Sequence, residues 1–377
     1  LLGVGCRGEP ASREPAEPIP DLAPAQEWVP AGEAAAIAET KAMLEKFVKK
    51  RFDATGTAHR DAHVKSHGCV QAHVTVYDGL ADNLAVGLFA APKTYAAWIR
   101  FSNSADAPAR DRKPDGRGMA IKLMNVPGEK ALPGQAHETS QDIILINYPV
   151  FVVRDAADYV EFTRDSTTGH PLRFFFGAGM SRIPELKSAE HLALQKVVSP
   201  ISPAYYSMTP YLLGEGQAAK YGARPCTTEQ RKRRRFGKDY LRKQLVDDLG
   251  SGGACFELML QVQTDVDRMP IEDPTVGWPE SLSPYVPVAR IDIPAQTFDS
   301  EPQRELCEYL TFNPWHTKLE HRPLGGINRV RKAVYGAIAS LRHGLDGVAV
   351  LEPTDHDVQG YLKAVRGVSS VVEARRP

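Results

Sequence analysis

Hydrophobic and polar positions recur along this chain with two different periods. In residues 31–52 the apolar side chains return every three or four positions, which predicts an amphipathic helix. Residues 325–345 show the same period after two glycines and predict a second long helix, while residues 159–198 indicate a mixture of helix and loop. The apolar stripe of the first helix is expected to consist of Ile37, Met43, Leu44 and Phe47.

Between these helices, short segments rich in β-branched and aromatic residues are separated by loops of Gly, Pro, Asp and Asn, a pattern typical of strands. The expected strands cover residues 72–77, 96–101, 119–123, 142–146, 255–264 and 286–294. We therefore predict an α+β fold of about six to eight strands, antiparallel and closed as a barrel, with helices before and after it.

The N-terminal segment has a different composition, acidic and rich in proline. It predicts a flexible tail or linker over residues 1–30, followed by a single domain over residues 31–377. Cys6 ends a short apolar run, so the tail is either without function or the remnant of a lipoprotein signal with Cys6 lipidated, although Gly3 departs from the Leu expected there. The expected location is the cytoplasm, or the periplasm with a lipid anchor if Cys6 is a lipoprotein cysteine.

Composition narrows the function classes. The 377 residues are 42% hydrophobic and 24% charged with a formal net charge of zero, which favours a globular protein and gives no case for nucleic acid as the main partner. No apolar run reaches the length of a membrane span. The five cysteines are scattered without a Cys-x-x-Cys pair, which predicts reduced, mostly buried thiols and neither a zinc ribbon nor a dense disulfide framework.

The C-terminal helix carries one unusual face. Arg331, Tyr335 and Arg342 fall within about 40° of one another around its axis, with Ile338 among them. One interpretation is a solvated basic stripe. The other is an iron site, because a guanidinium one turn away favours the phenolate form of tyrosine, which can bind ferric haem iron while the second arginine meets a propionate.

A second candidate site is the segment HRDAHVKSHGCVQAH, which places four histidines in residues 59–73. On a helix, His59, His63 and His67 would stack on one face and could bind zinc. However, the glycine after His67 leads into an alternating strand pattern, which argues against a long helix. His73 then belongs to the strand.

Five segments resemble motifs of the catalase family and occur in the same order. They are RDAHVK (60–65), RFS (100–102), RGMAIKL (117–123), NYPVFVVRD (147–155) and the Arg-x-x-x-Tyr pattern ending at 335. The first resembles the family's Arg-x-x-His motif and selects His63, although Ser66 stands where glycine is usual. The resemblance covers about residues 55–345.

The resemblance implies a catalase-like antiparallel β-barrel with flanking helices and haem b between the barrel and the C-terminal helix. Tyr335 would be the axial iron ligand, kept ionised by Arg331, and His63 would act as base and then acid on a peroxide. Ser102 would hydrogen-bond the imidazole. The remaining implied haem contacts are Arg60, Arg100 and Arg342 at the propionates and Phe151 over the ring face.

The asparagine above the haem is harder to place. Catalases have two consecutive asparagines before Thr-Pro, and an ungapped match puts Ile146 on the first, which is the usual functional one, and Asn147 on the second. Asn147 is the only candidate, and a shift of the strand by one residue would bring it over the haem.

Segments 211–226, 272–281 and 310–335 resemble the compact catalase-related haem proteins, which include coral-type allene oxide synthases and small bacterial haem peroxidases. The synthases have a threonine before the catalytic histidine, where this chain has Ala62, which leaves the imidazole free for acid–base catalysis. We therefore expect a peroxidase or catalase that uses hydrogen peroxide or organic hydroperoxides with an unknown small-molecule electron donor. This prediction allows a homo-oligomer. The alternatives are a fatty-acid hydroperoxide isomerase or lyase, and a haem-binding protein without activity.

Overall fold

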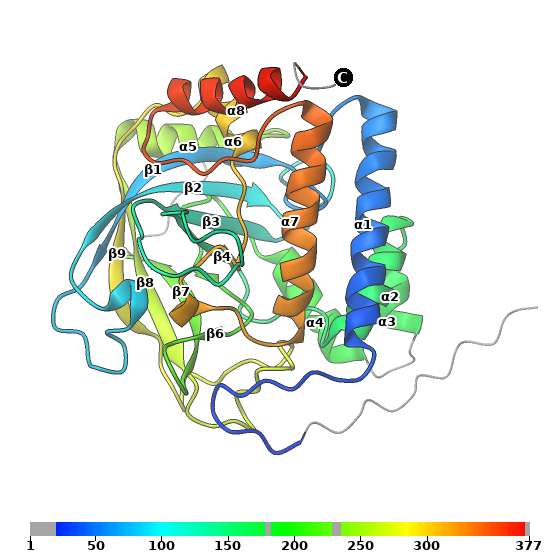
Figure 1. The fold of residues 1–377 in the computed structure, drawn as a ribbon, viewed down its shortest axis with the longest axis vertical. Helices are drawn as coiled ribbons and strands as arrows, with labels where there is room; N and C mark the ends of the chain where they lie inside the picture. Colours follow the sequence, from blue (N-terminus) through cyan, green and yellow to red (C-terminus); the bar gives the residue numbers. More distant parts are fainter. Residues whose placement is uncertain (1–19, 178–181, 228–234, 374–377) are drawn as a thin grey trace, which may run out of the picture.

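A closed β-barrel forms the centre of the protein in the computed structural model, which describes residues 20–177, 182–227 and 235–373 (Figure 1). The antiparallel sheet has the strand order β5-β4-β3-β2-β1-β9-β8-β7-β6, and it closes because β5 also pairs with β7. The strands are β1 (Ser66–Val76), β2 (Thr94–Asn103), β3 (Arg117–Leu123), β4 (Gln141–Ile146), β5 (Tyr205–Tyr206), β6 (Tyr211–Leu212), β7 (Ala218–Pro225), β8 (Ala254–Val262) and β9 (Val286–Ile293). The predicted α+β barrel is therefore confirmed.

Alternation along the strands separates the inside of the barrel from its outer surface. In β2, Ala97, Ile99 and Phe101 belong to the large apolar core that fills the barrel. Arg100 and Ser102 therefore point outward, to the surface that the helices cover. The candidate polar residues of this strand consequently lie outside the barrel core and face the helices.

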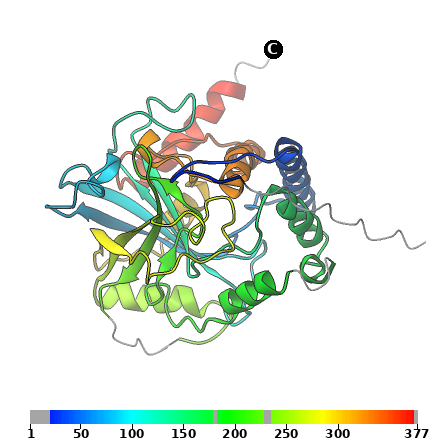
Figure 2. The ribbon, with the colours of Figure 1, turned by 90° about the horizontal axis from the view of Figure 1, so that it is seen from below.

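Three helices lie together on one side of the barrel, as Figures 1 and 2 show. They are α1 (Glu33–Thr55), α2 (Ala156–Thr167) and α7 (Gly326–Asp346). Leu44 and Val48 of α1 pack against Val330 and Val334 of α7 in one buried cluster, which also holds Ile338. The remaining helices are α3 (Leu172–Gly177), α4 (Ile183–Leu194), α5 (Tyr240–Ser251), α6 (Glu301–Tyr309) and α8 (Val358–Glu373).

The buried face of α1 differs from the predicted stripe. Thr40, Leu44 and Val48 are buried, four residues apart, whereas Met43 and Phe47 are only half-buried. The ring of Phe47 lies under the guanidinium of Arg51, at 5.0 Å from Arg51 Cζ. The helix is thus rotated relative to the prediction. The row of Thr40, Leu44 and Val48, spaced four residues apart, faces the neighbouring helices.

Part of the predicted N-terminal linker is tied to the domain. Glu27 accepts hydrogen bonds from Arg329 Nη1 and the Gly325 amide, both at 2.8 Å, at the start of α7. The Trp28 amide donates to Glu272 Oε1 at 2.9 Å. The prediction of a flexible tail is therefore wrong for this part, while residues 1–19, with the proposed lipoprotein cysteine Cys6, lie outside the described residues.

Four cysteines form two disulfides, so the prediction of reduced thiols is wrong. Cys69 of β1 is bonded to Cys307 of α6, and Cys226 is bonded to Cys255 of β8. The second pair follows from the sheet register, because β7 and β8 are paired up to the residues next to it. The first joins positions 238 residues apart, a proximity that only the tertiary fold creates.

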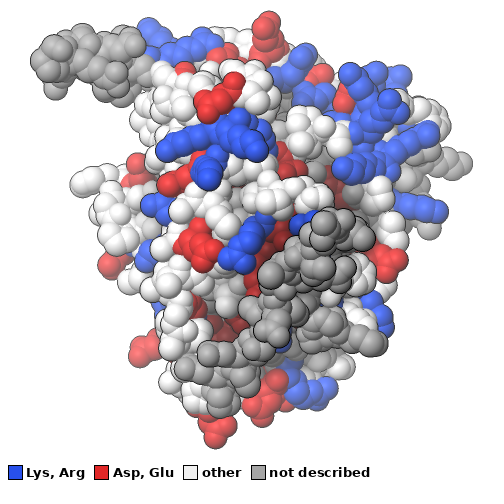
Figure 3. All heavy atoms as spheres, turned by 90° about the vertical axis from the view of Figure 1, so that its right-hand side faces the viewer, with Lys and Arg blue, Asp and Glu red and all other residues white. Residues whose placement is uncertain are grey.

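The surface carries charges of both signs. On the face seen in Figure 3, Lys and Arg side chains are interspersed with Asp and Glu, in keeping with the formal net charge of zero. Within the described residues, no helix combines the length and the hydropathy needed to cross a membrane.

Candidate functional site

His63 lies just before β1 with its imidazole above the outer surface of the barrel. Its Nδ1 is 3.0 Å from Ser102 Oγ of β2, and these two residues are called the barrel-side pair. Gly118 of β3 makes room for the ring, because a Cβ at this position would lie 2.7 Å from His63 Nδ1. Ser102 thus holds one ring nitrogen and leaves Nε2 as the nitrogen that can exchange a proton with a substrate.

The surroundings of His63 keep its imidazole neutral. Burial, together with the positive charges of Arg100, Arg331 and Arg60, lowers the pKa of His63 to about 3. These arginines belong to three separate parts of the chain, β2, α7 and the segment before β1. Since all of them act on His63, groups from the barrel and from α7 face one region between them.

On the opposite side, α7 presents Arg331 and Tyr335, which are called the helix-side pair. Arg331 Nη2 lies 3.4 Å from Tyr335 Oη, and Arg331 Nη1 donates to Asn328 Oδ1 at 3.0 Å and to Thr209 Oγ1 at 3.2 Å. Arg331 is buried, as is Arg342 further along the same helix. The interpretation of a solvated basic stripe is therefore wrong. Ile338, expected on this face, is buried and belongs to the apolar cluster of α1, α2 and α7.

Tyr159 lies near the helix-side pair, and Phe151 packs against Tyr159. Tyr159 of α2 is close enough for electrostatic interaction with Tyr335 and Arg331, and burial together with Asp61 and Tyr335 raises its pKa. Phe151 is half-buried and packs against Tyr159, with ring centroids 6.0 Å apart. Tyr159 was not predicted from the sequence, because nothing in a tyrosine on an expected helix identifies its neighbours.

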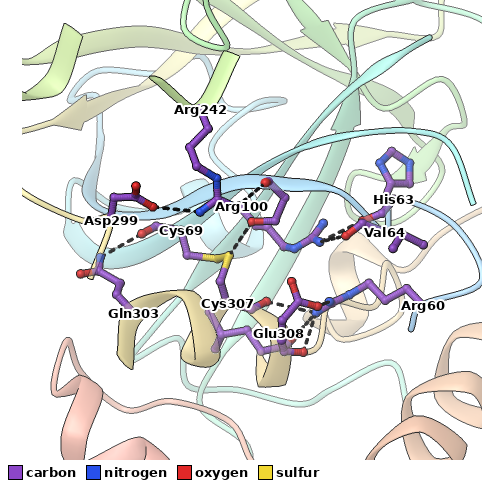
Figure 4. The surroundings of a disulfide bond; sticks show 12 residues. Arg60, His63, Val64, Cys69, Arg100, Arg242, Asp299, Gln303, Cys307 and Glu308 are labelled. Carbon is purple, nitrogen blue, oxygen red and sulfur yellow. Dashed lines mark hydrogen bonds and ion pairs between the residues drawn. A yellow bond between two sulfur atoms is a disulfide. The ribbon is translucent and has the colours of Figure 1, made fainter. Parts of the chain in front are cut away.

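Arg60 and Arg100 lie near the first disulfide and the Glu308 carboxylate (Figure 4), and Arg342 also interacts with Glu308; these three guanidinium groups are called the arginine cluster. Arg60 pairs with Glu308 at 3.0 Å and also donates to main-chain oxygens of α6 and the residue after it. Arg342 donates to the Glu308 carbonyl, and Arg100 donates to the His63 carbonyl at 2.9 Å.

The guanidinium groups of the arginine cluster are buried close to one another. Burial and the neighbouring Arg60 together lower the pKa of Arg342 to about 9. The same two causes lower the pKa of Arg100, whose Nε has no hydrogen-bond partner. Although burial opposes it, the three guanidinium groups hold the pKa of Glu308 below its usual value. Asp346 also interacts with Arg342, and Asp61 with Arg60, but burial and the mutual repulsion of the guanidinium groups still favour a further anion beside Arg100.

Asn147 lies directly after β4, and its side chain has partners within the protein. β3 and β4 pair without a shift, and Gly118 is opposite Ile146. Asn147 Oδ1 accepts from the Arg117 amide at 2.7 Å, and Asn147 Nδ2 donates to Gln195 Oε1 at 2.7 Å. The register lacks the shift that the expectation for Asn147 required, so its amide ends the β3–β4 ladder and Ile146 occupies the outward position.

The other histidines have separate places. β1 begins at Ser66, so His59, His63 and His67 do not share a helix. His67 is buried and its Nε2 lies 2.8 Å from Asn103 Oδ1, whereas His73 is exposed. Among the described residues no group of three potential metal ligands from His, Cys, Asp and Glu exists. The zinc alternative is therefore wrong for this segment.

Comparison with known proteins gives similarity in fold alone. No model of a protein family matches the chain, and no curated protein matches it. Among solved structures, a fungal catalase is 18% identical with a TM-score of 0.60, covering 78% of this chain and 61% of its own. Catalase A from Saccharomyces cerevisiae is 17% identical (TM-score 0.59, 79% and 64% covered), and a bacterial catalase is 16% identical (0.57, 87% and 64%). The chain thus spans less than two thirds of these catalases, and its fold is catalase-like.

Proposed function

We propose that the chain binds haem b between the barrel and α7 and uses it to reduce peroxides with electrons from an organic donor. The observation that carries this proposal is the opposition of two pairs, His63 with Ser102 on the barrel and Arg331 with Tyr335 on α7. A neutral imidazole faces the region from one side and a phenol beside a buried guanidinium faces it from the other. The catalase-like fold supports the same assignment.

The residues present fit a haem. Tyr335 would bind the iron, and Arg331 would stabilise its phenolate. The guanidinium groups of the arginine cluster, which repel one another, would pair with the carboxylates of haem, and Arg100 Nε, which has no hydrogen-bond partner, is a donor for one of them. Phe151, packed on Tyr159, lies on the side of the helix-side pair and would contact the ring face.

When bound, the haem iron supplies the redox chemistry for breaking the O–O bond. His63 Nε2 takes the proton of the peroxide O–H and returns it to the departing oxygen, and Ser102 keeps the ring oriented for both transfers. In balance, one hydroperoxide ROOH and two hydrogen-atom donors AH, such as phenols, give ROH, water and two radicals A•. With hydrogen peroxide, R is a hydrogen atom.

The isomerase or lyase alternative has weaker support. Ala62 offers no hydroxyl to the imidazole, and Ser102 already occupies Nδ1, so His63 is free to transfer a proton. Acid–base assistance favours the peroxidase reaction, in which the leaving oxygen must be protonated.

The proposal is tested by titrating the purified full-length chain with haemin. We expect one haem per chain, an absorption spectrum of the high-spin ferric, tyrosinate-bound type, and consumption of hydroperoxide that depends on a phenolic donor. A chain that binds no haem, or that binds haem and leaves both hydrogen peroxide and organic hydroperoxides intact, would contradict it.

A further inference from the structure

Next to His63, the outer surface of the barrel carries an apolar side chain. A small peroxide at this place would need a polar partner. Ser102, Gly118 and Ile146 are direct neighbours in β2, β3 and β4 and share the outward face. The imidazole of His63 lies above Gly118, the middle residue of this row, and it occupies the space that a Cβ of residue 118 would need. Side chains directly opposite on antiparallel strands are about 5 Å apart at Cβ. Ile146 therefore flanks the imidazole on the side away from Ser102.

A second apolar side chain extends this surface. A Cβ on Gly116 would lie 3.1 Å from both Ile146 Cδ1 and Leu192 Cδ1 of α4, so the two methyl groups approach the same point, and 2.9 Å from Ser104 Oγ, which donates its hydrogen to Asp115. The side-chain amide of Asn147, the residue after β4, is occupied by Gln195 and the Arg117 amide. Ile146, which is opposite Gly118, and Leu192 thus form an apolar patch on the surface that carries the imidazole.

We propose that Ile146 is a specificity-determining residue that favours organic hydroperoxides with an apolar substituent over hydrogen peroxide. This inference rests on the proposed function, because it concerns the substrate of the same site. Hydrogen peroxide has only polar groups, so placing it against Ile146 removes a hydrogen-bond partner without replacing it. An alkyl or aryl hydroperoxide directs its O–O–H group to His63 and its apolar substituent to Ile146 and Leu192, where contact is favourable.

The reaction is the one written above with R an apolar group. The O–O bond breaks, the oxygen attached to R leaves as ROH, the other oxygen leaves as water, and two phenolic donors supply the two electrons and two protons. The hydrocarbon part of R takes no part in the chemistry. Its contact with Ile146 therefore acts on binding and orientation, and it discriminates between substrates through kcat/KM.

The test compares Ile146→Asn with Ile144→Asn in the haem-loaded full chain. Ile144 is on the same strand and the same outward face, but it is opposite Ala120 and one step further from His63. For each protein, kcat/KM is measured with hydrogen peroxide and with cumene hydroperoxide, using a phenolic donor. We expect Ile146→Asn to raise the ratio of hydrogen peroxide to cumene hydroperoxide about tenfold, as one gained hydrogen bond and one lost apolar contact imply. Ile144→Asn should change it less than twofold.

A binding readout separates specificity from turnover. The affinity for 2-phenyl-2-propanol, the redox-inert alcohol formed from cumene hydroperoxide, is followed through the haem absorption bands. It should weaken several-fold in Ile146→Asn and stay unchanged in Ile144→Asn and in Ile146→Val, which keeps the apolar surface and guards against misfolding. Suppose that Ile146→Asn reduces both peroxides with the wild-type kcat/KM ratio and binds 2-phenyl-2-propanol with the wild-type affinity. This result would overturn the role of Ile146 and leave the proposed function standing. A wild-type chain without haem or without peroxide turnover would overturn the proposed function, and this inference with it.

Discussion

Two buried charge clusters on the outside of the barrel invite comparison. In the first, Lys122 of β3 donates to Asp142 at 2.6 Å and to Glu352, and Ser140 donates to Glu352 at 2.9 Å. We call it the closed network. The second is the arginine cluster, in which three guanidinium groups lie around Glu308 and Arg100 Nε has no hydrogen-bond partner.

The two clusters differ in what completes them. In the closed network Asp142 and Glu352 raise the pKa of Lys122 despite its burial, so the cation is matched from within the chain. In the arginine cluster burial and mutual repulsion lower the pKa of Arg100 and Arg342. A buried charge that lacks a partner is costly. The closed network therefore serves the fold, whereas the arginine cluster is arranged for an anion that the chain does not itself contain.

Breaking the closed network should have the largest effect on stability. Lys122→Met removes the cation and leaves Asp142 and Glu352 buried side by side, which costs about 3–5 kcal/mol of unfolding free energy. Urea unfolding of the haem-free protein measures it. The exposed Lys332→Met serves as the control and should change stability by less than ~0.5 kcal/mol. Equal stabilities of Lys122→Met and wild type would end the distinction between the clusters.

The disulfide beside the arginine cluster should also stabilise the fold. Replacing Cys69 and Cys307 by serine removes a crosslink between β1 and α6, and we expect a loss of about 3 kcal/mol. The loop it closes spans 238 residues, against 29 for Cys226–Cys255, so the matched double substitution at the second pair should cost less. Thermal or urea unfolding of the two double variants decides it, and the reverse order would refute the loop argument.

His63 should matter for turnover and little for stability. His63→Ala removes the proton-transferring nitrogen and should lower kcat/KM for hydroperoxides by at least ~10², while haem binding is retained. His73→Ala, at an exposed position of β1, is the matched control and should keep wild-type rates. If both variants turn over peroxide equally fast, His63 is not the acid–base group.

The arginine cluster should respond in the opposite sense to the closed network. Arg342→Met removes a buried cation that the neighbouring Arg60 repels, so the haem-free protein should be as stable as wild type or slightly more so. Its affinity for haem should fall about tenfold, the effect of ~1.4 kcal/mol from one lost charge-assisted hydrogen bond. Competition with apomyoglobin for haem measures this affinity. A large loss of stability without any change in affinity would assign Arg342 to the fold.

Local patterns in the sequence predicted most of the barrel and the helix that carries Tyr335. The strand expected at 96–101 is β2 (Thr94–Asn103), and the helix expected at 325–345 is α7 (Gly326–Asp346), because both have a clear period and end at glycine or polar residues. β7 was missed, since Lys220 and Pro225 interrupt its pattern. In the fold, Lys220 is buried with its Nζ 4.8 Å from the ring centre of Trp278.

The candidate site was predicted in its motifs but not in its contacts. The positions of His63 and Ser102 followed from short motifs, and the structure brings them within 3.0 Å. Glu308 belongs to no motif, so the sequence did not identify it. The structure does, because the disulfide holds α6 beside Arg60. The outward position of Ile146 depends on strand register, which an ungapped comparison of sequences suggests and only the pairing of β3 and β4 decides.

The central claim is that α7 holds a haem through Tyr335. The most direct measurement is a haemin titration of Tyr335→Phe beside wild type, with absorption spectra at each step. Phenylalanine keeps the ring and removes the oxygen that lies 3.4 Å from Arg331 Nη2. We expect the variant to lose most of its haem or to bind it with shifted Soret and charge-transfer bands. A variant with the wild-type affinity and an unchanged spectrum would contradict the account.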